Sequence, residues 1–102
     1  MVSVVVKKNR KKEYVGFTCN GHAGFDEYGK DIVCAAVSST VITTVNGILS
    51  VEPSSLNVIE GDTLIIEILK HNKVVDGLIN NMINLLTELK NDYKDNIDIR
   101  RC

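Results

Sequence analysis

The chain has 102 residues, of which 44% are hydrophobic and 25% are charged, and its formal net charge is −1. These proportions are typical of one small globular domain and exclude a disordered chain. A near-neutral chain has no overall positive field to attract nucleic acid, and no apolar run approaches the length expected of a membrane span. We therefore expect a single cytoplasmic domain over residues 1–102.

The three cysteines, Cys19, Cys34 and Cys102, have spacings that match no zinc-binding pattern. An odd number of cysteines favours reduced thiols over a disulfide framework. We expect neither a metal nor another cofactor.

The first predicted elements are two strands. Alternation over residues 2–6 predicts one, and residues 13–19 predict another with Val15, Phe17 and Cys19 on one face. This spacing makes Cys19 a core residue. Residues 7–12, Lys-Lys-Asn-Arg-Lys-Lys, either bind RNA or form a solvated hairpin turn. Because no aromatic residue lies between the charges, we favour the turn.

A loop over residues 20–30 leads into the longest predicted element. Asp31 stands where a helix N-cap belongs, so that Cys34 is the third helical residue. Six consecutive β-branched residues, 40–45, oppose a helix by local propensity. The length of the run, residues 32–51, and Pro53 beyond it favour the helix. Since this helix is apolar on most sides, we expect a second copy to cover part of it, in a homodimer.

The second half of the chain predicts two strands, a helix and a strand. Strands over residues 56–59 and 63–70 flank Glu60-Gly61-Asp62, in which we expect Gly61 to supply the positive φ of a tight turn. Apolar spacing of i, i+3, i+4 and i+7 over residues 75–89 predicts an amphipathic helix, and alternation over residues 96–100 predicts a last strand. The order is ββαββαβ, an α+β fold with a sheet packed against two helices.

The loop and the start of the first helix carry the candidate catalytic residues. A helix N-terminus stabilises a thiolate, so Cys34 is suited to nucleophilic attack. The glycines of the loop allow His22 to approach the sulfur and act as base and then as acid. The alternative interpretation is an inert buried cysteine beside a surface or core histidine. His71, the other histidine, follows a predicted strand, and we expect it to be solvated.

The supporting roles stay open at this stage. Asp31 either orients His22 or only caps the helix. Ser38, one turn after Cys34, either lines the site or bonds to the preceding backbone carbonyl. The oxyanion donors are N–H groups of the first helical turn or of the loop.

The loop itself allows two further interpretations. Residues 23–30 form a candidate lid, with Gly24 and Gly29 as hinges. Gly21-His22-Ala23-Gly24 also fits the GxxG of KH domains, although a strand precedes it here.

This part of the chain resembles a known family, the ribosomal-processing cysteine proteases of certain bacteria. The residues that match its signature are Gly21-His22-Ala23, Gly29 and Asp31-Ile32-Val33-Cys34-Ala35-Ala36-Val37-Ser38. The remaining chain is similar to the family in length and element order and carries no motif of comparable strength. The resemblance implies that His22 and Cys34 are the catalytic pair.

The resemblance also implies a substrate. Such an enzyme is a cysteine endopeptidase that removes a short N-terminal extension from a protein of the bacterial large ribosomal subunit. The partner is then the ribosomal protein precursor, with no membrane and no direct nucleic acid involved. The alternative is a non-catalytic, ribosome-associated module that binds RNA or protein, in which residues 7–12 and the GxxG loop hold RNA.

Overall fold

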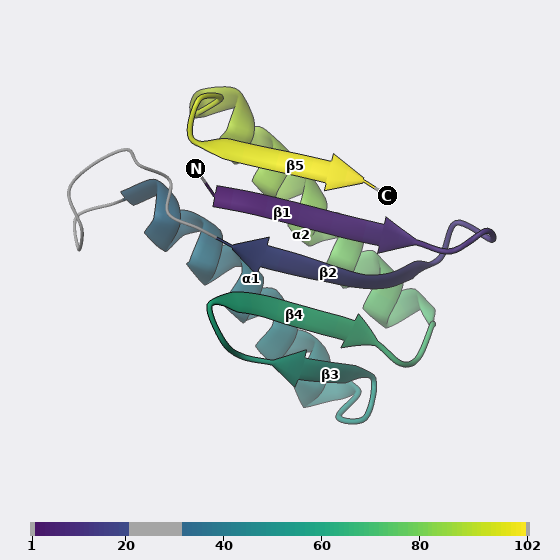
Figure 1. The fold of residues 1–102 in the computed structure, drawn as a ribbon. Coiled ribbons are helices and arrows are strands. Elements are labelled where there is room, and N and C mark those ends of the chain that lie inside the picture. The colour runs from purple at the N-terminus through teal and green to yellow at the C-terminus, as the bar shows by residue number, and fades with distance from the viewer. Residues whose placement is uncertain (1, 21–31, 102) are drawn as a thin grey trace.

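The computed structural model describes residues 2–20 and 32–101. In these ranges it contains five strands and two helices (Figure 1), namely β1 (Val2–Lys8), β2 (Tyr14–Asn20), α1 (Ile32–Val51), β3 (Leu56–Ile59), β4 (Thr63–Ile68), α2 (Lys73–Asp92) and β5 (Ile97–Arg101). This confirms the predicted order ββαββαβ and the α+β class. The bounds differ from the prediction by one or two residues at several strand ends.

The strands form one sheet in the order β3-β4-β2-β1-β5. All neighbouring strands are antiparallel except β1 and β5, which are parallel. Both helices lie on the same face of this sheet, where they pack against each other (Figure 1). The core therefore lies between one layer of strands and one layer of helices. Its largest buried side chains are Phe17, Ile48, Ile66, Ile79, Met82, Leu86 and Ile97.

The helix α1 forms although many of its residues favour strands. Its buried residues make one stripe along the helix, composed of Val33, Val37, Val41, Val45 and Ile48. The hydroxyls of Thr40 and Thr44 donate hydrogen bonds of 2.8 Å to the carbonyls of Ala36 and Thr40, respectively. These bonds satisfy polar β-branched side chains within the helix.

By length and composition alone, α1 is apolar enough to cross a membrane. The expectation that no apolar run of this chain approaches that length is therefore wrong, because alanines, threonines and serines separate the aliphatic residues without adding a charge. In the structure, one side of α1 packs into the core beneath the sheet.

The basic run forms the predicted hairpin turn between β1 and β2. The Asn9 side-chain oxygen accepts hydrogen bonds from the backbone N–H groups of Lys11 (2.9 Å) and Glu13 (3.0 Å). Within the described ranges, Lys12 is the one non-glycine residue with a positive φ, 64°. Asn9 therefore fixes the turn by a local side-chain bond, while the basic side chains of residues 10–12 are exposed.

The expectation of a positive φ at Gly61 is wrong, because its φ lies outside the left-handed region. The last paired residues of the β3–β4 hairpin are Ile59 and Ile65, which leaves five residues between them. Loops of this length are usually built around type I turns, whose φ angles are negative.

The helix α2 confirms its amphipathic pattern. The side chain of Asn72 accepts a 2.9 Å hydrogen bond from the N–H of Val75 and caps the helix. Five of the seven apolar residues at this spacing are buried, Val75, Ile79, Met82, Ile83 and Leu86, and the other two, Leu78 and Leu89, are partly buried. The hydroxyl of Tyr14 donates a hydrogen bond to the Asn80 side chain, which joins α2 to β2.

Gly16 provides a test of the sheet packing. A Cβ atom at this position would lie 2.7 Å from the backbone oxygen of Ile66 in β4, so Gly16→Ala forces two central strands apart. We expect it to lower the free energy of unfolding by about 1–3 kcal/mol in urea denaturation. Gly77→Ala is the matched control, since a Cβ there meets nothing within 4 Å. It should raise stability by up to about 1 kcal/mol through helix propensity. Equal stability of the two variants would contradict this account.

Candidate active site

Of the predicted site residues, the structure describes Cys34 and Ser38. The other five, Gly21, His22, Gly24, Gly29 and Asp31, lie outside the described residues, as do the candidate lid and the GxxG loop.

Cys34 is the third residue of α1 and is half-buried against the core. The first N–H groups of a helix have no acceptor within the helix, and the positive end of the helix dipole lies there. The first turn of α1 contains no acidic residue that would oppose this field. The position therefore suits a group that carries negative charge during a reaction, as the sequence predicts.

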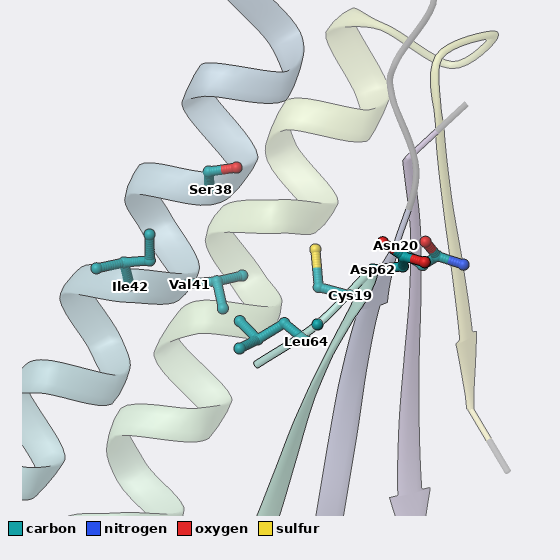
Figure 2. Close-up of a pocket in the computed structure, with 8 residues that line it drawn as sticks. Cys19, Asn20, Ser38, Val41, Ile42, Asp62 and Leu64 are labelled. Carbon is teal, nitrogen blue, oxygen red and sulfur yellow. The ribbon is translucent and has the colours of Figure 1, made fainter. Parts of the chain in front are cut away.

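Ser38 and Ile42 follow Cys34 at intervals of four residues, so the three side chains share one side of α1. Ser38, Val41 and Ile42 form one wall of a pocket of about 160 Å³. Figure 2 shows Ser38 and Val41 on α1, with Cys19 and Leu64 on the sheet side of this pocket. The remaining lining residues are Asn20, Gly61 and Asp62. Cys34 thus lies one helical turn from a pocket that Ser38 lines.

Cys19 borders the core, as the strand alternation predicts, and it also borders this pocket, which the alternation does not predict. It lies on the helix-facing side of β2, opposite Leu64 of β4, and is half-buried. The pairing of Cys19 with Leu64 joins segments 45 positions apart and leaves no local signal in the sequence. The same holds for Asp62 and Leu64, which sequence reasoning did not assign to the site.

The two thiols interact electrostatically. Burial raises the pKa of the Cys19 thiol, and the negative charge of a Cys34 thiolate raises it further. Neither Cys19 nor Cys34 is part of a disulfide. Cys19 therefore stays protonated to a higher pH than an ordinary cysteine.

His71 is exposed in the connection between β4 and α2. This connection lies at the opposite end of the sheet from the start of α1 (Figure 1). The prediction of a solvated histidine is confirmed, and His71 is too distant to serve Cys34. Since the chain has two histidines, His22 is the remaining candidate.

The basic turn also lies far from the start of α1. Residues 9–13 precede β2 and Asn20 ends it, so they lie at opposite ends of the sheet (Figure 1). A strand of seven residues spans about 23 Å at 3.3 Å per residue. The basic residues 10–12 therefore lie far from Cys34 at the start of α1. In the part of the chain that the structure describes, no group of His, Cys, Asp or Glu is arranged to hold a metal ion.

Comparisons with known proteins agree with this geometry. A family described as cysteine protease Prp matches residues 1–98. The ribosomal processing cysteine protease Prp of Bacillus subtilis is 29% identical over 107 residues, covering 97% of this chain and 96% of that protein.

Two solved structures of an essential ribosomal processing protease Prp from S. aureus share the fold at 24% identity, each over 100% of both chains. The TM-score is 0.93 for the complex with a covalently linked product peptide and 0.88 for the complex with a substrate peptide.

The interaction between the two thiols can be measured by alkylation. In a pH series with iodoacetamide, the Cys19 rate should rise at a more alkaline pH than that of a short cysteine peptide, because its pKa is raised. In Cys34→Ser the Cys19 profile should move to lower pH. It should stay above that of the peptide, since burial is the larger cause. Mass spectrometry of the alkylated fragments gives both rates, and an unchanged Cys19 profile in Cys34→Ser would contradict the interaction.

Proposed function

The chain belongs to the cysteine protease Prp family, and from that membership we propose that it removes a short N-terminal extension from a bacterial large-subunit ribosomal protein in the cytoplasm. The observation that carries this proposal is the position of Cys34, half-buried in the first turn of α1 and one turn from a pocket. The names of its relatives, which are ribosomal processing proteases, support the choice of substrate.

The proposed chemistry is acyl transfer by His22 and Cys34. The Cys34 thiolate attacks the scissile carbonyl carbon, and negative charge develops on the carbonyl oxygen. Backbone N–H groups of the first turn of α1 are the candidate donors to this oxygen. The C–N bond then breaks as His22 protonates the leaving amine. Water, deprotonated by His22, releases the acyl group and restores the thiolate.

The supporting residues retain narrower proposed roles. Ser38 lines the pocket next to Cys34, which supports its role in the site over a purely local backbone bond. Asp31 is the candidate to orient His22, and Gly21, Gly24 and Gly29 shape the loop that carries the histidine.

Substitution of the proposed nucleophile tests the reaction. Cys34→Ala should abolish cleavage of the unprocessed ribosomal protein, because no other group replaces the attacking sulfur. His22→Ala should reduce the rate by about 10²–10⁴-fold. His71→Ala is the matched control and should retain activity, because His71 is exposed at the opposite end of the sheet. Mass spectrometry of the products measures both rate and cleavage position. Cleavage by Cys34→Ala at a rate near that of the parent would refute the mechanism.

We also propose that the enzyme is a homodimer formed through the outward side of α1. The core covers one side of this helix, while Ile32 on the other side is 57% exposed. The outward positions include Ala35, Ser39 and Thr43, and the whole helix carries no charged residue. A helix that faces only water normally has a charged outer side, so a second copy of α1 is the cover that this surface fits.

Sedimentation tests the homodimer. At micromolar concentration the protein should sediment at about twice the chain mass. Thr43→Arg, which puts a charge at the centre of the outward side, should convert it to a monomer. Asn84→Arg on the exposed side of α2 is the control and should leave the dimer intact. A parent protein that is monomeric at all concentrations would exclude this interface.

A further inference from the structure

The pocket beside Cys34 is one end of a longer groove. A second pocket of about 370 Å³ adjoins it, and the two share Ile42 and Leu64. The other lining residues of the second pocket are Val45, Asn46 and Leu49 of α1, and Val58, Glu60 and Ile66 of the β3–β4 hairpin. We call the two pockets together the α1–hairpin groove.

This groove follows the side of α1 that carries Cys34. Ser38, Ile42, Val45 and Leu49 come 4, 8, 11 and 15 positions after Cys34, a spacing that keeps all of them on one side of the helix. At 1.5 Å per residue, Ser38 and Ile42 lie about 6 and 12 Å along the axis from Cys34, and Leu49 lies about 22 Å away. An extended peptide advances about 3.3 Å per residue. Its side chains therefore reach the first pocket about two to four residues from the scissile bond and the second about four to seven residues away.

The two pockets have the same chemical character. Each has aliphatic walls from α1 and the sheet, and each has one carboxylate on the hairpin turn, Asp62 in the first pocket and Glu60 in the second. Both turn residues are exposed, and none of the described residues that line the two pockets is basic. Lysine and arginine place an aliphatic stem on apolar surface and a charge at its edge. An apolar wall that ends in a carboxylate is complementary to such a side chain.

We propose that the α1–hairpin groove binds one side of the substrate peptide, and that Asp62 and Glu60 select basic side chains in it. This inference rests on the proposed role of Cys34, because the groove is a substrate site only if the reaction takes place at its end. Asp62 selects a Lys or Arg about two to four residues from the scissile bond, and Glu60 selects one about four to seven residues away. Neither residue takes part in the chemical step.

A charge exchange tests the groove. The substrates are peptides that span the cleavage site of the ribosomal protein, in which each Lys or Arg within seven residues of the scissile bond is replaced by Glu in turn. With the parent enzyme, one replacement two to four residues away should lower kcat/KM by about 3- to 10-fold. Asp62→Lys should lower kcat/KM for the unchanged peptide by a similar factor and recover part of the loss for that Glu peptide. Glu60→Lys should do the same for a more distant position.

The control variant is Asp95→Lys. Asp95 is exposed on the turn between α2 and β5, away from the groove. Asp95→Lys makes the same change of charge as the groove variants and should leave kcat/KM for every peptide unchanged. Both groove variants should also lower the kcat/KM difference between low and high salt, because they remove an attraction that salt screens. Circular dichroism confirms that the variants are folded.

The outcomes separate the groove from the catalytic proposal. If Asp62→Lys and Glu60→Lys cleave every peptide as the parent does, the groove inference is overturned while the role of Cys34 stands. If the parent cleaves none of the peptides, the proposed function fails. Fluorescence polarisation then tests the groove alone, by measuring peptide binding to Cys34→Ala proteins that carry a second substitution. Binding should weaken when the second substitution is Asp62→Lys and should not change when it is Asp95→Lys. Equal binding by these two double variants would overturn the inference.

Discussion

The burial of one aliphatic stripe on α1 is the constraint on which the fold and the site both depend. Each buried Val or Ile contributes about 1.5–3 kcal/mol relative to its exposed form, and the stripe has five such residues. A β-branched residue in a helix costs less than about 0.7 kcal/mol relative to Ala, so the six residues 40–45 together cost less than about 4 kcal/mol. The free energy gained by burying the stripe exceeds the cost of placing β-branched residues in a helix, and the helix forms. The same packing fixes the orientation of α1 and with it the positions of Cys34 and the groove.

The site combines residues from three separate segments. Cys34 and Ser38 come from α1, Cys19 from β2, and Asp62 and Leu64 from the β3–β4 hairpin. The antiparallel pairing of β2 with β4 brings the hairpin beside the end of β2, from which the chain continues towards α1. The position of the site at this edge therefore follows from the sheet order rather than from any one motif.

The sequence predicts those features that rest on local patterns. The spacing of aliphatic residues defines α2, and the length of the run that ends before Pro53 defines α1. The motif at residues 21–38 identifies the candidate nucleophile. Features that depend on pairing between distant strands do not leave such patterns. The contact of Cys19 with the pocket requires the register of β2 against β4, and the φ of Gly61 depends on where the β3–β4 ladder ends. The membrane-like composition of α1 is also a local pattern, because none of its 20 residues is charged.

The parallel pairing of β1 with β5 has a consequence for biosynthesis. Val2 and Val4 of β1 pair with Ile97 and Ile99 of β5, which are synthesised much later. Every residue of α1 and of the hairpin is thus synthesised before the strand that completes the sheet beside β1. Contacts between distant parts of a chain slow folding, because closing the long loop between them costs conformational entropy before the contacts form and stabilise it. The nascent chain consequently exposes one edge of β1 until β5 has been synthesised, and only then can the sheet be completed.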